Sequence, residues 1–280
     1  MRKTAISMCS YVLCMSAFGG FFRWIQNMSA FEPETGLMIH GSIWSKLTLV
    51  VLLVAVAGIF FLARRLWYKD YYPAQTFEAL FAGDEYWNAK MAKIFSGLML
   101  IGAVVLILLA QYHVYHSILR TLALLGALTA WAFMKLVRLP YDGKSPNMVS
   151  VLASVPVLLY CYWLLVSYRT NAAVPSVWRY GLEILAICAS IMAMFYVAGY
   201  GFHTPKPYHA LAWLNTGALL SLVTITDSRL LGLQIMLLAG AGMQLYLSWM
   251  IISTMQDQWP EDVEETAGEA VDGAEAPQAE

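Results

Sequence analysis

The sequence predicts an all-α, polytopic integral membrane protein, a bundle of about eight transmembrane helices. Hydrophobic residues make up 60% of its 280 positions, whereas soluble domains contain about 45–50%. Charged residues make up 12%, about half of the usual quarter. A soluble chain of this length needs a charged exterior, and this chain has too few charges to supply one. The composition therefore excludes an ordinary soluble domain.

Eight stretches have close to the ~20 apolar residues that a helix needs to cross a bilayer core of about 30 Å. The short segment 112–117 separates the third stretch from the fourth, and these two are too long together for one span. We therefore predict two antiparallel helices there and a transmembrane helical domain over residues 1–255. The predicted spans run from Thr4 to Phe22, Leu47 to Ala63, Ile94 to Tyr112, Ile118 to Leu136, Val149 to Tyr168, Tyr180 to Tyr200, Tyr208 to Ile225 and Leu230 to Ile252.

The first stretch has a competing interpretation as a signal peptide. It begins with Met1-Arg2-Lys3 and ends with Ala17-Phe18-Gly19-Gly20, which resembles the basic, apolar and small-residue regions of such peptides. No pair of small residues precedes an obvious cleavage site, so we expect the span to be retained. Cleavage would leave seven spans in the same orientation.

Basic residues near the span ends predict the orientation, because cytoplasmic loops are enriched in Lys and Arg. With the N-terminus inside, the inner segments hold 11 basic residues and the outer segments hold six. This bias predicts that both termini lie in the cytoplasm. The inner set is Arg2, Lys3, Arg64, Arg65, Lys69, Lys90, Lys93, Lys135, Arg138, Lys144 and Lys206, and the outer set is Arg23, Lys46, Arg120, Arg169, Arg179 and Arg229.

Two predicted cytoplasmic segments are candidates for contact with a protein partner. Residues 73–82 begin with Pro73, and Phe77, Leu80 and Phe81 share one helical face, so we predict a helix on the inner membrane surface. Residues 256–280 contain nine of the 18 acids and no base. Such a segment buries too little apolar surface to order itself, so we predict a disordered acidic tail. Both segments have a simpler interpretation that involves no partner.

The predicted first outer loop is the most distinctive segment of the chain. The pair Gly19-Gly20 is expected to loosen the end of the first helix, and Gly36 permits a left-handed turn. Two carboxylates, Glu32 and Glu34, follow Arg23 in this loop. They are candidates for a polar lid or a cation site, and the alternative is a solvated turn.

The run Arg23-Trp24-Ile25-Gln26, followed by Phe31-Glu32-Pro33-Glu34-Thr35-Gly36-Leu37, carries a family resemblance. It resembles the first outer loop of uncharacterised polytopic membrane proteins from anaerobic Gram-positive bacteria. The resemblance covers about the first 40 residues, and beyond them only the hydropathy layout is similar. It implies a bacterial plasma membrane and no mechanism.

Polar groups inside the spans are few, and such groups are often functional. Glu183 is the acid that lies clearly within a span, and Arg179 precedes it by four residues, so we predict an ion pair within one helix. Arg23, Arg120 and Arg229 are other candidate partners. Asn215 and Gln244 are predicted at similar depth, about 10 Å from the inner ends of the last two spans. We expect an amide–amide hydrogen bond between them, or a polar substrate site.

The sequence contains no signature of catalysis. Walker, nucleophile-elbow and zincin motifs are absent, and the four cysteines are scattered in apolar stretches. His113 and His116 are three residues apart, but a metal site normally requires a third ligand. No basic stripe indicates nucleic-acid binding. We therefore expect no enzyme activity, no cofactor and no resident metal, with the lipid bilayer as the main partner.

Two functional hypotheses remain, and a third ranks last. The first is a small-solute permease, with Glu183, Asn215 and Gln244 along its path; multispan chains without a soluble domain commonly have this function. The second is a non-catalytic assembly, sensory or regulatory subunit that contacts partners through residues 73–82 or the acidic tail. The third, an enzyme acting on lipid, would need clustered acids or histidines. We predict the permease.

Overall fold

The structure is a computed structural model that describes residues 2–32, 35–67, 73–74, 76–81, 84–142, 147–172, 174 and 176–255. The predicted acidic tail, 256–280, lies outside the described residues. The described part forms nine α-helices and one turn of 3₁₀ helix. Their bounds are α1 Arg2–Ser29, α2 Ile43–Trp67, α3 Phe77–Leu80, α4 Glu85–Ala110, α5 His116–Asp142, α6 Asn147–Thr170, α7 Val177–Gly201, α8 Pro207–Val223, η1 Thr224–Thr226 and α9 Leu231–Ser253.

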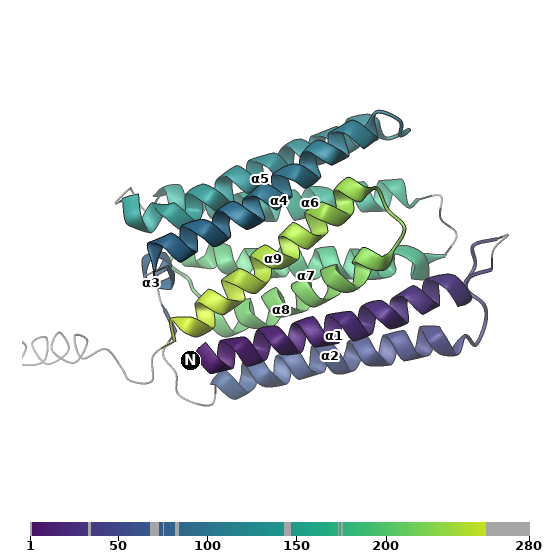
Figure 1. Ribbon diagram of the computed structural model, residues 1–280, viewed down its shortest axis with the longest axis horizontal. Coiled ribbons are helices and arrows are strands. Elements are labelled where there is room, and N and C mark those ends of the chain that lie inside the picture. Colours follow the sequence, from purple (N-terminus) through teal and green to yellow (C-terminus); the bar gives the residue numbers. More distant parts are fainter. Residues whose placement is uncertain are drawn as a thin grey trace, which may run out of the picture.

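Eight of these helices are long and apolar enough to cross a membrane, and they coincide with the eight predicted spans. The fold class is therefore confirmed: the protein is an all-α integral membrane protein. Successive long helices run in opposite directions, so the start of α1 and the end of α9 lie at the same end of the bundle (Figure 1). We call this end the terminal end, and the opposite end, which carries the α1–α2, α4–α5, α6–α7 and α8–α9 connections, the pocket end.

Six of the helices pack in sequence to close a ring. Each helix from α4 to α9 contacts the next one, and α9 contacts α4. The α1–α2 hairpin packs outside this ring, mainly against α8 (Figure 1). As a result α8 is covered on several sides. In its most apolar stretch 72% of the residues are buried, whereas the figure for α2 is 28%. The centre of the protein lies inside the ring, beside α8 and α9.

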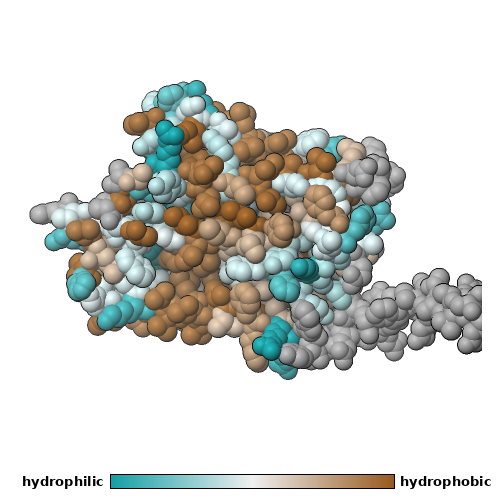
Figure 2. All heavy atoms as spheres, turned by 180° about the vertical axis from the view of Figure 1, so that it is seen from behind, coloured by the Kyte–Doolittle hydropathy of each residue, from teal (hydrophilic) through white to brown (hydrophobic). Residues whose placement is uncertain are grey.

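The outer faces of the peripheral helices are apolar, as contact with lipid requires. Exposed aliphatic side chains recur at helical spacing on α4 and α6, as at Ile101, Val104 and Leu108. Figure 2 shows hydrophobic side chains in a broad belt across one face, with most hydrophilic side chains towards its two ends. Such a belt contacts the hydrocarbon core of a bilayer without leaving polar groups unsatisfied.

The first helix differs from the prediction at its end. α1 continues through Gly19-Gly20 to Ser29, about two turns beyond the predicted Phe22. Gly19 is a site of close packing, because a Cβ there would lie 2.9 Å from a Val223 side-chain carbon on α8. The glycine pair therefore lets α1 approach α8, and the extra turns carry Arg23 into the protein. The predicted left-handed turn at Gly36 is confirmed, with φ +67°.

The predicted surface helix over 73–82 is shorter than expected and faces inward. α3 is a single turn, and the side-chain oxygen of Thr76 accepts a hydrogen bond from the backbone N–H of Ala79 at its start. Phe77, Leu80 and Phe81 are all buried in the core of the protein. The apolar face that was predicted to lie on the membrane is thus covered by the chain itself. Asp84 caps the next helix, α4, because its side chain accepts a hydrogen bond from the backbone N–H of Tyr86.

Two glycines of α4 provide a matched test of the ring packing. A Cβ on Gly102 would lie 2.9 Å from the backbone nitrogen of Met236 on α9, whereas a Cβ on Gly97 would meet nothing within 4 Å. Gly102→Ala should lower the free energy of unfolding by about 1–3 kcal/mol, because the two helices must separate. Gly97→Ala should leave it unchanged or raise it by up to about 1 kcal/mol.

Denaturation of both variants in mixed micelles measures this difference. Equal stabilities of the two alanine variants would contradict the close approach of α4 and α9.

Candidate functional site

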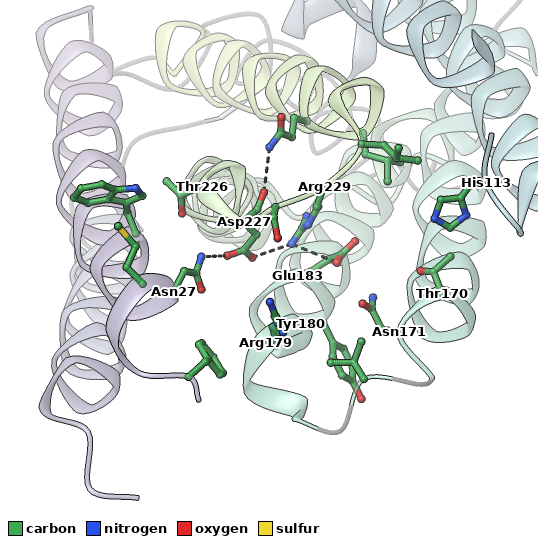
Figure 3. A pocket seen from close by; sticks show the side chains of 18 of the residues that line it. Asn27, His113, Thr170, Asn171, Arg179, Tyr180, Glu183, Thr226, Asp227 and Arg229 are labelled. Carbon is green, nitrogen blue, oxygen red and sulfur yellow. Dashed lines mark hydrogen bonds and ion pairs between the residues drawn. The ribbon is translucent and has the colours of Figure 1, made fainter. Parts of the chain in front are cut away.

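A cluster of four buried charges lies at the pocket end. Asp227 is at its centre, directly after the 3₁₀ turn that ends α8. The backbone of Asp227 is held on both sides: its N–H donates to the carbonyl of Thr224 at 3.2 Å, and its carbonyl accepts from the side-chain amide of Gln234 at 3.1 Å. The carboxylate is thereby fixed between α1 and the start of α9 (Figure 3).

Arg23 is the most buried member of the cluster, with 1% of its surface exposed. Its Nε donates to Asp227 Oδ1 at 2.7 Å. The two Nη groups donate to the carbonyls of Trp178 and Arg179 in the first turn of α7, at 3.2 and 2.8 Å, and Nη1 also donates to Gln26 Oε1 at 3.2 Å. One guanidinium therefore joins α1, α7 and the α8–α9 connection.

Arg229 links the second pair of charges. Its Nη2 lies 3.0 Å from Asp227 Oδ2 and 3.3 Å from Glu183 Oε2, and all three side chains are only 8% exposed. Trp163 and Ser167 of α6 lie within hydrogen-bonding reach of the Glu183 carboxylate. The cluster thus contains two guanidinium groups and two carboxylates, which is the pairing that buried charges require.

A pocket of about 840 Å³ opens beside this cluster at the pocket end. Glu183, Asp227 and Arg229 form part of its wall, and Arg179, His113 and other residues of α1, α5, α6 and α9 complete it (Figure 3). Its volume lies within the range of about 300–1,000 Å³ that is typical of small-molecule sites. The pocket combines charged groups, polar groups and apolar side chains, and it can therefore orient a small solute.

The structure does not bring together the residues that the sequence analysis singled out in the first outer loop. Arg23 belongs to the buried cluster, as described above. Glu32 is exposed and accepts a hydrogen bond from the hydroxyl of Thr35 at 2.6 Å, which is the geometry of a solvated turn. Glu34 lies outside the described residues. Arg23 therefore finds its carboxylate partner in Asp227, far away in the sequence.

The predicted partner of Glu183 is wrong. Its carboxylate contacts Arg229 instead of Arg179, and the Arg179 guanidinium lies 5.9 Å from the ring centre of Phe31. Arg229 was one of the three other candidates, with Arg23 and Arg120, and it lies in the α8–α9 connection. The start of α9 brings it to the buried face of α7, whereas Arg179 is exposed.

The predicted amide–amide bond between Asn215 and Gln244 is also absent. Asn215 Nδ2 donates to the hydroxyl of Ser248 at 2.7 Å, and Gln244 Nε2 donates to the hydroxyls of Ser190 and Tyr160 at 2.9 and 3.3 Å. Both amides are completely buried and hold helices of the ring together, as predicted. They do not border the pocket.

Several residues of the site escaped the sequence analysis. The clearest is Asp227, for which a signal was present: it is the one acid between Glu183 and Asp257 in the sequence, and it is two residues before Arg229. Asn27 donates to Asp227 Oδ1 at 2.8 Å and had no distinguishing pattern. The hydroxyl partners Tyr160, Ser190 and Ser248 are common residues of membrane helices and carry no signal of their own.

The described residues contain no group of three or more His, Cys, Asp and Glu side chains that could hold a metal ion. His113 borders the pocket, where its Nδ1 accepts a hydrogen bond from the backbone N–H of Tyr115 at 3.3 Å.

Comparison with known proteins identifies no relative. The chain matches no protein-family model, no curated protein and no solved structure. The resemblance of the first outer loop to anaerobic Gram-positive membrane proteins stays a prediction. Function is therefore inferred from the geometry alone.

The cluster makes a direct prediction for stability. Arg23→Met should lower the free energy of unfolding by about 3–5 kcal/mol, because the buried carboxylates of Asp227 and Glu183 are then left to share the single positive charge of Arg229. Arg23→Lys keeps the charge but loses the forked contacts to α7, so its loss should be smaller. Unfolding in mixed micelles measures both, with Arg120→Met, which removes an exposed guanidinium at the same end, as the control. A loss no larger than that of the control would contradict the role assigned to Arg23.

Proposed function

We propose that this protein is a plasma membrane permease for a small polar solute, which enters through the pocket. The observation that carries the proposal is the position of the pocket at the mouth of the helical ring, above a series of buried polar groups. The proposal assigns no catalytic step to the chain.

The buried polar groups follow one another along the inside of the ring. Ser190 is seven residues beyond Glu183 on α7, which is about 10 Å deeper by helical rise, and it accepts from Gln244. Ser248 is one turn further along α9 and accepts from Asn215. A further buried hydrogen bond, from the hydroxyl of Tyr246 to Asn88 Oδ1 at 2.9 Å, lies near the start of α4 at the terminal end. Polar groups in membrane helices that face a bundle interior commonly mark a solute path.

Between the pocket and the terminal end, side chains fill the interior of the ring. The rings of Tyr160 and Trp163 are stacked at 6.2 Å with an interplanar angle of 9°, and both are buried. Gly217 and Gly240 make room for the Gln244 amide and the Tyr160 hydroxyl, which lie directly against them. In the proposed cycle this is the state open at the pocket end, and these close packings separate on the way to the opposite state.

The alternative function, an assembly or regulatory subunit, has less support. One of its two candidate contact surfaces was the apolar face of residues 73–82, and Phe77, Leu80 and Phe81 of that face are buried. The other, the acidic tail, lies outside the described residues. The mixed charged and apolar wall of the pocket instead favours a small molecule.

A steric plug tests whether the pocket holds the solute. Native mass spectrometry of the protein extracted mildly from its own membrane should show a bound small molecule. Leu233→Trp, which adds bulk to the pocket wall on α9, should abolish this adduct and the uptake of the same molecule into proteoliposomes. Leu238→Trp places the same bulk on an exposed position of α9 and should preserve both.

A stoichiometric protein partner in place of the small molecule would refute the permease and favour the subunit. An adduct that survives Leu233→Trp would locate the solute elsewhere.

The proposed orientation places the pocket end outside the cell and both termini in the cytoplasm. In a variant with the four native cysteines replaced by alanine, Tyr112→Cys should react with a membrane-impermeant maleimide in intact cells, because Tyr112 is 92% exposed in the α4–α5 connection. Lys206→Cys, exposed in the α7–α8 connection, should react only after permeabilisation. The reverse pattern would invert the protein and make the pocket cytoplasmic.

A further inference from the structure

The guanidinium of Arg229 has a free, buried donor at the pocket wall. Nη2 makes both contacts to the carboxylates of Asp227 and Glu183. Nη1 has no hydrogen-bond partner among the described residues and is itself enclosed by the protein, although Arg229 as a residue borders the pocket. A ligand in the pocket therefore reaches Nη1 only when the Arg229 side chain turns toward it. A buried charged donor without an acceptor costs more free energy than an unsatisfied neutral donor. An acceptor atom of a ligand in the pocket would remove this cost.

The charges around the pocket favour an anionic acceptor. Arg179 and Arg229 line the pocket together with the carboxylates of Glu183 and Asp227. Arg23 does not line the pocket, but its guanidinium pairs with Asp227 from behind the wall, so the local group holds three guanidiniums and two carboxylates. One positive charge is therefore in excess. It is supplied by Arg179, which borders the pocket and is exposed, and an exposed positive charge at a pocket mouth attracts anions.

The remaining walls favour an organic anion over an inorganic one. The pocket volume of about 840 Å³ is far larger than a bare ion needs. Trp24, Phe31, Leu230 and Leu233 provide apolar walls, which bury the carbon skeleton of a ligand. A guanidinium binds a planar carboxylate through parallel hydrogen bonds.

We infer that the pocket binds a small organic acid, whose carboxylate lies near Arg179 and accepts a hydrogen bond from Arg229 Nη1 once the Arg229 side chain turns toward the pocket. The inference names the solute class of the proposed permease and rests on that function only for the step of transport. Binding itself follows from the free donor, the excess charge and the apolar walls.

Binding is tested on the full chain in nanodiscs by isothermal titration calorimetry with benzoate. Benzamide, a neutral analogue of similar shape, and inorganic phosphate are the comparison probes. Benzoate should bind saturably, and benzamide should bind at least about tenfold more weakly, since a charge-assisted hydrogen bond contributes about 1.5–3 kcal/mol.

Two substitutions that each remove one charge should act in opposite directions. Arg179→Gln removes the excess positive charge and should weaken benzoate binding about two- to fivefold, as expected for an exposed charge. Glu183→Gln removes a carboxylate that competes for Arg229 and should tighten benzoate binding by a similar factor. Arg120→Gln is the control at the same end of the protein, because Arg120 is exposed and does not border the pocket, and it should change nothing.

Each outcome decides the inference. Equal affinities for benzoate and benzamide, weaker binding in both pocket variants, or binding of phosphate alone would overturn it. If Glu183→Gln fails to fold, the comparison of Arg179→Gln with Arg120→Gln decides alone. Benzoate binding without uptake of any carboxylate into proteoliposomes would leave the inference standing and refute the permease. Uptake of only neutral or cationic solutes would refute the inference and leave the permease.

Discussion

The ion pair between Arg23 and Asp227 is the interaction on which the pocket end depends. A guanidinium that is 99% buried is tolerated only when its charge is balanced and its donors are satisfied. Asp227 balances the charge, and the carbonyls of Trp178 and Arg179 take two of the donors. These contacts set the position of the first turn of α7 relative to α1, and so they position Glu183 one turn further along. The wall of the pocket follows from this arrangement.

The sequence was sufficient to predict the helices but not the polar contacts between them, for a physical reason. A membrane span is a local property, because about 20 apolar residues in a row are sufficient for it, and all eight spans were found in this way. A partner depends on how separate spans pack. Glu183 has Arg179 four residues away in its own helix, yet it contacts Arg229, because the buried face of α7 is turned towards the start of α9. Amide pairing between Asn215 and Gln244 failed similarly: each amide found a hydroxyl on a neighbouring helix.

Several glycines of the bundle mark close helix packing, including a pair that the sequence analysis expected to loosen a helix. Gly19-Gly20 was expected to loosen a helix, but α1 continues through both residues and Gly19 packs closely against α8. On α9, Gly232 lies against the backbone of Leu106, and Gly240 lies against Tyr160. In a bilayer, where apolar side chains gain little from mutual association, close approach at small residues is a main source of helix–helix attraction. A sequence shows where these small residues are, but it does not show which helix packs against each one.

The pairing of Arg23 with Asp227 also has a consequence for biosynthesis. The two residues are separated by 204 positions, so Arg23 enters the membrane long before its carboxylate partner has been synthesised. Until α7 and the α8–α9 connection arrive, its guanidinium must stay near the headgroups, where a long side chain can reach water. We therefore expect α1 to reach its final position, with Arg23 buried, only when the last helices have been inserted. We likewise expect the pocket to assemble only after α7 and the α8–α9 connection have been inserted, because until then Arg23 lacks the carboxylate of Asp227.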